Sequence, residues 1–208
     1  MKTLAILGAS GHGKVVADAA EDSGWDAIEF FDDAWPGLST NGVWPVVGTG
    51  ADLLGRVQDY QGVLIAIGNN EVRQRKLIEL KAAGANLPTL LHPTAVVSRY
   101  ATLGPGTVVL ATAVVNAFAR IGECCIVNTG SSVDHDCNLG DCVHVCPGAR
   151  LAGMVRVGDL SWIGIGACVR QVLEIGSRVV VGAGAAVVGN ISDNMTVAGV
   201  PARVIGST

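Results

Sequence analysis

A six-residue repeat runs through the second half of this 208-residue chain and restricts its fold more than any other feature. Every sixth residue from Val97 to Val187 is Val, Ile or Leu, and the frame never slips. Two positions before each aliphatic residue the side chain is usually small, as at Ala95 and Ser131. Because side chains alternate between the two sides of a strand, both sets point inward. A hexad period of this kind predicts a parallel β-helix.

Three hexads would make one triangular coil, so residues eighteen apart should stack at about 4.8 Å, the spacing of paired strands. Glycine often follows the aliphatic residue, as at Gly104, Gly122 and Gly140. We expect a corner of the coil at these glycines, because a corner can use the freedom of glycine in φ. Cys125 and Cys137 occupy small inward positions and are expected in the core.

The outward residues just before the aliphatic positions form columns along the predicted β-helix. One column is polar, whereas another consists of four apolar residues and one histidine: Val108, Ile126, His144, Trp162 and Val180. A column of this size is too apolar to be left facing water, so it predicts a subunit interface or a ligand groove. The simpler interpretation is scattered apolar side chains on the surface. We expect Ile126 and Trp162 at an interface between subunits.

The first half of the chain alternates short aliphatic runs with helical stretches, which predicts a small α/β domain with a parallel sheet. Since the pattern changes around His92 and Pro93, we expect one domain at 1–91 and a second at 92–208. The expected helices are Gly13–Ser23 and Glu71–Ala83. The expected strands are Thr3–Leu7, Ala27–Phe31, Val46–Val47, Val63–Ile67 and Pro88–Leu91.

Charge and cysteine usage argue against several classes of protein. The formal net charge is −4 and no run of Lys or Arg occurs, so we expect no nucleic-acid partner. No apolar stretch approaches the roughly eighteen residues of a membrane span, and the N-terminal apolar run is too short for a signal peptide. The cysteines lie between Cys124 and Cys168 without a C-x-x-C pair, which favours reduced thiols. We therefore expect a cytoplasmic protein.

A glycine-rich segment from Gly8 to Lys14 follows the first expected strand, where backbone N–H groups and a helix dipole attract phosphate. The segment matches G-x-x-x-x-G-K, but Val15 stands where a P-loop needs the hydroxyl that holds Mg²⁺. It is not G-x-G-x-x-G, although Asp32 and Asp33 lie near where a dinucleotide fold keeps its ribose-binding acid. The remaining interpretations are nucleotide binding without hydrolysis or hydride transfer, and a glycine turn needed only for packing.

Cysteines and a histidine in the repeat permit a metal hypothesis. Cys142, His144 and Cys146 share one outward side, and Cys124 lies eighteen residues before Cys142. The inward cysteines fit the core instead, and we expect no metal. His92 precedes Pro93 at the domain junction, where a structural role is expected.

His135 differs from the other histidines in its surroundings. Val133 points inward, so the next three positions turn a corner and present His135 between Asp134 and Asp136. A neutral imidazole with a pKa of about 6.5 beside a carboxylate is a suitable general base. Gly153 lies eighteen residues later, directly above the histidine, and its missing side chain is expected to leave room for a ligand. The simpler interpretation is a charged corner that only keeps the protein soluble.

Six motifs spread along nearly the whole chain carry a family resemblance in combination, although each alone is weak. They are GASGHG at Gly8–Gly13, FDD at Phe31–Asp33, AIGNNEVR at Ala66–Arg73, NTGSSVDHD at Asn128–Asp136, HVCPGARLAG at His144–Gly153 and GVPAR at Gly199–Arg203. Taken together they resemble the PglD/NeuD-like sugar acetyltransferases. The resemblance implies an N-terminal Rossmann-like α/β domain for a nucleotide sugar and a C-terminal left-handed parallel β-helix. It also implies a homotrimer through the β-helix, with active sites between neighbouring subunits.

The activity implied by the resemblance is transfer of an acetyl group from acetyl-CoA to the 4-amino group of a UDP-linked amino-dideoxy sugar. His135 would be the base and Asp136 its supporting acid, at a position where some relatives carry Glu. Ala183 falls where a relative has a glycine that lines the CoA channel. The residues implied for the UDP-sugar are Ser10, Gly11, His12, Asp32, Asp33 and Gly68, and those for acetyl-CoA are His144, Gly153 and Ile165.

Three alternative functions remain to be compared with this one. The nearest is O-acetylation of a sialic acid or another sugar hydroxyl, which the sequence separates poorly from N-acetylation. A β-helical carbonic anhydrase needs three zinc histidines, whereas only His135 and His144 lie within the repeat. A nucleotide-sugar-binding protein without catalysis is the third alternative.

Overall fold

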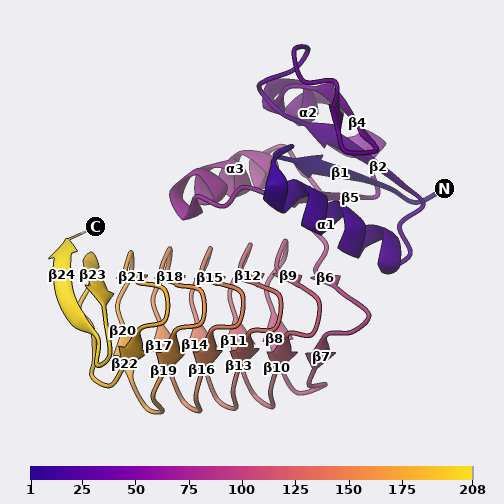
Figure 1. Cartoon of the computed structure of the whole chain (residues 1–208). Coiled ribbons are helices and arrows are strands. Elements are labelled where there is room, and N and C mark those ends of the chain that lie inside the picture. Colours follow the sequence, from indigo (N-terminus) through magenta and orange to yellow (C-terminus); the bar gives the residue numbers. More distant parts are fainter. Residues whose placement is uncertain (208) are drawn as a thin grey trace.

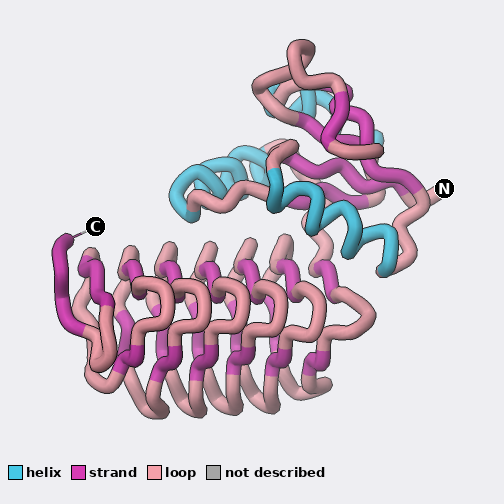
Figure 2. The backbone as a smooth tube through the Cα atoms, in the orientation of Figure 1, coloured by secondary structure: helices cyan, strands magenta, loops and turns pink. Residues whose placement is uncertain are grey.

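An α/β unit formed by the first part of the chain lies along one side of a long three-sided β-helix (Figure 1). The computed structural model describes residues 1–207. Figure 2 shows that the helices are confined to the α/β unit, whereas the β-helix consists of very short strands joined by turns. Among residues 1–207, no helix is long and apolar enough to cross a membrane.

The α/β unit has the predicted architecture. Its strands are, in spatial order, β3 (Thr40–Asn41), β4 (Trp44–Gly48), β2 (Ala27–Phe31), β1 (Thr3–Leu7) and β5 (Gly62–Ile65). Its helices are α1 (Gly11–Asp22), α2 (Gly50–Arg56) and α3 (Asn70–Ala82), with a 3₁₀ turn at Val57–Asp59. All paired strands are parallel except the edge pair β3 and β4. The strand β5 is buried along its whole length, as expected of a parallel strand covered on both faces.

The strand expected at Pro88–Leu91 does not belong to this sheet. The observed strand β6 (Leu90–Leu91) pairs with β9 (Val108–Val109) of the β-helix. The reason is visible in the sequence, because Leu91 lies six residues before Val97 and is therefore in frame with the hexad repeat. The β-helix begins one hexad earlier than predicted.

Three sheets form the sides of the β-helix, and each coil contributes one strand to each side. Their strands are parallel except for the last pair, β23 and β24, which is antiparallel. The six-stranded sheet contains β7 (Val96–Val97), β10 (Val114–Val115), β13 (Ser132–Val133), β16 (Arg150–Leu151), β19 (Cys168–Val169) and β22 (Ala186–Val187). The five-stranded sheet of the β-helix contains β8 (Thr102–Leu103), β11 (Arg120–Ile121), β14 (Asn138–Leu139), β17 (Arg156–Val157) and β20 (Glu174–Ile175). The eight-stranded sheet contains β6, β9, β12 (Ile126–Val127), β15 (His144–Val145), β18 (Trp162–Ile163), β21 (Val180–Val181), β23 (Met195–Ala198) and β24 (Arg203–Ser207).

The inward side chains fill the β-helix as the repeat predicts. Successive coils pair in a register of eighteen residues, as Val109 with Val127 and Val127 with Val145. The aliphatic residues of this register form one buried core together with the small residues, which include Cys125 and Cys137. The two inward cysteines are therefore core residues, as expected.

The glycines after the aliphatic positions have a different role from the one predicted. The left-handed turn residue lies three positions after the aliphatic residue, as at Gly130 (φ 65°), Phe118 (φ 62°) and Asp136 (φ 58°). Gly104 and Gly122 lie outside that region, but a Cβ on Gly104 would stand 2.6 Å from the carbonyl oxygen of Gly122. Glycine is needed there because the backbones of neighbouring coils approach too closely for any side chain.

The α/β unit of the same chain covers the first part of the apolar column. Val108 and Ile126 are 2% and 1% exposed, and they share a buried cluster with Val16 of α1. The expectation that Ile126 lies between subunits is therefore wrong. The hexad period shows which residues point outward, but it does not show what covers them. Trp162 remains half-buried, and its ring lies edge-on against that of His144 at a centroid distance of 4.3 Å.

Candidate active site

A cavity of about 370 Å³ lies at the C-terminal ends of β1, β2 and β5, where the order of strands in the sheet reverses. Open α/β sheets usually bind their ligands at this place. The cavity gathers four of the six residues implied for the nucleotide sugar, namely Ser10, Asp32, Asp33 and Gly68. Arg75 and Lys76 of α3 also line it, and the sequence analysis missed both. The available signal was a pair of cations one turn into the helix that follows Gly68.

The glycine-rich segment is held in a fixed turn beside this cavity. The N–H of Gly8 donates to the carbonyl oxygen of Phe31 (2.8 Å), and Gly8 has a φ of 108°. A Cβ on Gly8 would stand 2.9 Å from the carbonyl oxygen of Ala66, so both the space and the backbone require glycine. Ser10 precedes α1 without a side-chain cap hydrogen bond, and the first turn of α1 carries no acidic residue. Its first N–H groups are therefore suited to an anion.

The two aspartates of the cavity each support a loop. The Oδ2 of Asp32 accepts from the N–H of Ala9 (2.8 Å), which fixes the glycine turn. The Oδ1 of Asp33 accepts from the N–H of Gly50 (2.9 Å) at the start of α2. A carboxylate has several acceptor sites, so both groups retain capacity for a ligand hydroxyl.

His12 and His144 face each other where α1 meets the eight-stranded sheet, with ring centroids 6.2 Å apart. Nε2 of His144 lies 3.0 Å from the side-chain amide nitrogen of Asn128. Burial lowers the pKa of His144 to about 3 and that of His12 to about 4, and the charge of Arg73 acts in the same direction. Both imidazoles are therefore neutral at pH 7. Within residues 1–207, Nε2 of His12 and Nδ1 of His144 are buried without a hydrogen-bond partner.

His135 lies in the exposed turn between β13 and β14, fixed by its neighbours. Its N–H donates to Oδ1 of Asp134, and its carbonyl oxygen accepts from the N–H of Met154 in the next coil. Its Nδ1 lies 2.8 Å from Oδ2 of Asp136. This hydrogen bond is the main cause that raises the pKa of His135 above its ordinary value. The arrangement directs Nδ1 to the carboxylate and leaves Nε2 as a proton acceptor.

Gly153 stands next to His135 as predicted, but the space above it is used differently. A Cβ at position 153 would lie 2.5 Å from Cε1 and Nε2 of His135. The missing side chain makes room for the imidazole of His135 itself. The expectation that a ligand also reaches this place beside the imidazole stays a prediction.

The residues implied for the site fall into two groups, which lie on different sides of the molecule. The first, here called the cavity half-site, consists of the cavity, His12 and His144, with the exposed residues Ile165 and Ala183 in the adjoining turns. The second, here called the turn half-site, consists of His135, Asp136 and Gly153.

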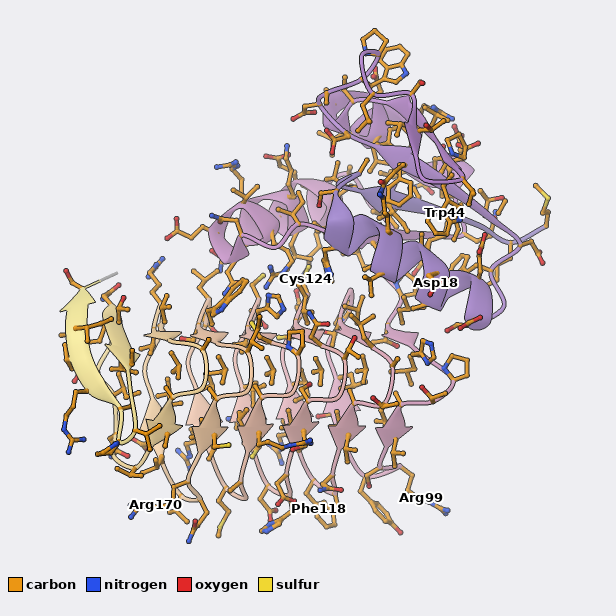
Figure 3. All side chains as sticks on the ribbon, viewed as in Figure 1. Asp18, Trp44, Arg99, Phe118, Cys124 and Arg170 are labelled. Atoms are coloured by element: carbon orange, nitrogen blue, oxygen red, sulfur yellow. The ribbon has the colours of Figure 1, made fainter. Side chains whose placement is uncertain are left out.

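The two half-sites lie apart within one chain. The turn from β13 to β14 joins the six-stranded and five-stranded sheets, so it lies at the edge opposite the eight-stranded sheet. Figure 3 shows Phe118, which stacks below Asp136 one coil earlier, at the edge far from the α/β unit, whereas Cys124 lies directly beneath that unit. A single chain therefore does not bring His135 to the cavity.

A second cavity, of about 430 Å³, lies between the start of α3 and the eight-stranded sheet. Trp162, Asn70 and Arg178 contribute to its lining. Within residues 1–207, no three His, Cys, Asp or Glu side chains form a group that could hold a metal ion.

Comparisons with known proteins give close matches over the whole chain. Residues 3–80 match the family model of the PglD N-terminal domain. The acetyltransferase domain of PglB from Neisseria gonorrhoeae, solved with acetyl coenzyme A, is 44% identical with a TM-score of 0.95, covering 98% of this chain and 99% of that one. A mutant of perosamine N-acetyltransferase from Caulobacter crescentus, solved with CoA and GDP-perosamine, is 36% identical with a TM-score of 0.92, covering 100% and 98%.

A curated relative matches more narrowly. UDP-N-acetylbacillosamine N-acetyltransferase from Bacillus subtilis (strain 168) is 40% identical over 118 residues. The match covers 53% of this chain and 52% of the relative, so it spans about half the length of that enzyme.

Proposed function

Because the chain belongs to the PglD/NeuD-like sugar acetyltransferase family, we propose that it transfers the acetyl group of acetyl-CoA to the 4-amino group of a UDP-linked amino-dideoxy sugar. Relatives solved with acetyl-CoA, or with CoA and a nucleotide-linked amino sugar, support this reaction. We also propose that residues 1–91 bind the nucleotide sugar and that residues 92–208 carry out the transfer. The first strand of the β-helix, β6 (Leu90–Leu91), falls at the end of the first of these segments.

The observation that carries the proposal is the pair of half-sites. The cavity half-site offers a glycine turn, the uncapped start of α1 and two cations at Arg75 and Lys76, which suit a nucleoside diphosphate. The turn half-site offers an imidazole with a raised pKa, which suits removal of a proton from an amine. The cavity half-site therefore offers groups for the nucleotide, and the turn half-site offers the proton acceptor.

The reaction needs only one proton acceptor. The sugar amine forms a C–N bond to the thioester carbonyl carbon, the C–S bond breaks, and CoA leaves as the thiolate. Nε2 of His135 accepts the proton that the amine loses and returns it to the thiolate or to solvent. Asp136 holds Nδ1 and stabilises the imidazolium that forms. Direct transfer is supported by the burial of five of the six cysteines, because a nucleophile must reach its substrate; they are Cys124, Cys125, Cys137, Cys142 and Cys146. The sixth, Cys168, is exposed on strand β19 of the six-stranded sheet and belongs to neither half-site.

A homotrimer would complete the site by bringing the turn half-site of one subunit to the cavity half-site of the next. The turn column around His135 supports such a contact, since Phe118, Met154 and Val172 are large, exposed and apolar. Each has a positive φ of 61–62°, a conformation that glycine adopts more easily. Because these apolar side chains occupy a costly backbone conformation and are exposed in the single chain, we infer that they pack against another surface. In this trimer, acetyl-CoA is held by His144, Ile165 and Ala183 of one subunit and by Gly153 of the next.

The test is an acetyl-transfer assay with several acceptors. The protein is incubated with acetyl-CoA and a panel of UDP-4-amino sugars, a GDP-4-amino sugar and sialic acids, and free CoA thiol is followed. We expect thiol release with a UDP-4-amino sugar and an amide product that resists hydroxylamine. A hydroxylamine-labile ester would indicate O-acetylation instead. No thiol release with any acceptor would favour a nucleotide-sugar-binding protein without catalysis.

A further inference from the structure

Arg73 of α3 is a fully buried cation at the contact between the α/β unit and the β-helix. Among the described residues, no carboxylate forms an ion pair with it. Burial of a charge without a counter-charge is costly unless every donor finds an acceptor. Arg73 meets this condition, because each of its five N–H bonds has an oxygen partner. Nε donates to the carbonyl oxygen of Cys124, Nη1 to those of Ile67 and Gly68, and Nη2 to that of Cys142 and to Oδ1 of Asn70, at 2.8–3.1 Å.

The acceptors of Arg73 belong to two different parts of the candidate site. Ile67 and Gly68 form the loop after β5 that lines the cavity. Cys124 and Cys142 are the left-handed turn residues of two successive coils, with φ of 52° and 55°. The coil of Cys142 also carries His144, two residues later. One rigid, planar group therefore connects the wall of the cavity to the coil of His144.

Asn70 extends the same contact to a third coil. Its side-chain amide donates to the carbonyl oxygens of Leu160 (2.8 Å) and Ser161 (3.1 Å), while its Oδ1 accepts from Arg73. Leu160 is the next left-handed turn residue above Cys142. Asn70 and Arg73 together bind three successive coils, those of Cys124, Cys142 and Leu160. They therefore fix the position of the start of α3 along the axis of the β-helix.

We propose that Arg73 is a positioning residue that sets the alignment of the cavity on the β-helix, and so places the acceptor sugar relative to His144. Arg73 lines neither cavity and acts through the loop at Ile67–Gly68. The inference rests on the proposed function, because alignment matters only if a group bound in the cavity must reach the β-helix.

Simple adhesion between the two units is the competing explanation, and α3 offers a matched control. Lys81, in the last turn of α3, also reaches the β-helix, where its Nζ lies 2.6 Å from Oε2 of Glu123. This pair is substantially exposed, and exposed ion pairs contribute little to stability. Lys81 is therefore a cation of the same helix that contacts the same partner but does not touch the loop of the cavity.

The experiment compares Arg73→Met, Arg73→Lys, Asn70→Ala and Lys81→Met in the full chain. Methionine keeps the length without donors, and a lysine ammonium cannot reproduce the planar fork. A misplacement of about 1 Å can cost about 100-fold in rate, so we expect Arg73→Met to lower kcat by about 10- to 100-fold. Arg73→Lys should also lower kcat, and Asn70→Ala should lower it by a smaller factor. The Kd for UDP and the KM for acetyl-CoA should stay within about threefold, and Lys81→Met should behave as wild type.

Amide hydrogen exchange provides a readout that does not depend on activity. Arg73→Met and Arg73→Lys should exchange faster than wild type and Lys81→Met at residues 66–70 and 142–146, because both segments lose a shared support. If Arg73→Met does not fold, Arg73→Lys and Asn70→Ala carry the test.

Two results would overturn the inference. A folded Arg73 variant that keeps kcat within about threefold of wild type makes the residue structural only. A parallel loss of UDP affinity places its effect in the cavity instead of the alignment. If the wild-type protein transfers no acetyl group, the proposed function fails, and the exchange data alone then decide whether Arg73 joins the loop to the coils.

Discussion

Gly153 lies directly against the imidazole of His135, since a Cβ at position 153 would stand 2.5 Å from both Cε1 and Nε2 of the ring. Gly153→Ala should therefore push the ring out of place without unfolding the exposed turn. We expect kcat to fall by at least about tenfold, because small displacements of a catalytic group are costly. Steady-state kinetics and a thermal melt check this. Gly189→Ala, at a glycine with nothing within 4 Å, is the control. A Gly153→Ala enzyme with wild-type kcat would show that catalysis does not depend on the present position of the His135 ring.

His135→Ala should remove the proton acceptor while leaving the fold intact, because the side chain is half exposed. A general base contributes about 10²- to 10⁴-fold, so kcat should fall by that order, with acetyl-CoA binding nearly unchanged. Rapid quenching without acceptor tests for acetylated enzyme at the same time. Accumulation of such a species, or near-wild-type kcat, would contradict direct transfer through His135.

Asp136→Asn should shift the pH dependence as well as the rate. Asp136 is the main cause of the raised pKa of His135, and only the unprotonated imidazole accepts a proton. Without the carboxylate the pKa of His135 falls, so the acidic limb of kcat/KM should move to lower pH. The maximal rate should fall by less than in His135→Ala, because the imidazole stays in place. A pH profile from about 5.5 to 9 is the measurement, and an unmoved acidic limb would exclude this role for Asp136.

Mixed oligomers test whether the site lies between subunits. His135→Ala lacks the turn half-site and His144→Gln alters the cavity half-site, so each homotrimer should be impaired. In every mixed trimer one of the three interfaces joins two intact halves, so the isolated mixed species should regain about a third of wild-type activity. Co-expression with two different affinity tags isolates the mixed species. If activity stays at the level of the separate variants, both halves are needed in one chain.

Nucleotide binding should need no metal. Val15 stands where a P-loop carries its Mg²⁺ hydroxyl, and the cavity instead offers Arg75 and Lys76. Titration calorimetry with UDP, GDP, ATP and NAD should show binding of UDP that is unchanged by EDTA. Lys76→Met should weaken it. Preferential binding of NAD would contradict an acetyltransferase and favour an oxidoreductase.

The sequence predicted the β-helix because its signal is periodic. The register of Val109, Val127 and Val145 follows from counting, and so does the stacking of Gly153 next to His135. What the period could not supply was contact with the rest of the chain. Ile126 looks like an interface residue until α1 covers it.

Other features depended on distances that a pattern does not contain. The repeat pattern marks Gly104 as a position that needs glycine. The reason glycine is needed is the close approach of the backbone of the next coil, which no local rule on φ reveals. The sequence shows Arg73 only as the last residue of the motif at Ala66–Arg73, because a cation on a helix is expected to face solvent. Its burial follows from carbonyl groups more than fifty residues away in the β-helix.

The contact of α3 with the β-helix has a consequence for evolution. Asn70 and Arg73 bind main-chain carbonyl groups of Cys124, Cys142, Leu160 and Ser161, and every residue type presents that same group. Mutations at these β-helix positions can therefore accumulate without breaking the contact, provided that the turns keep their conformation. A search for pairs of positions that change together would find no partner for Arg73 in the β-helix, although Arg73 joins the two units of the protein.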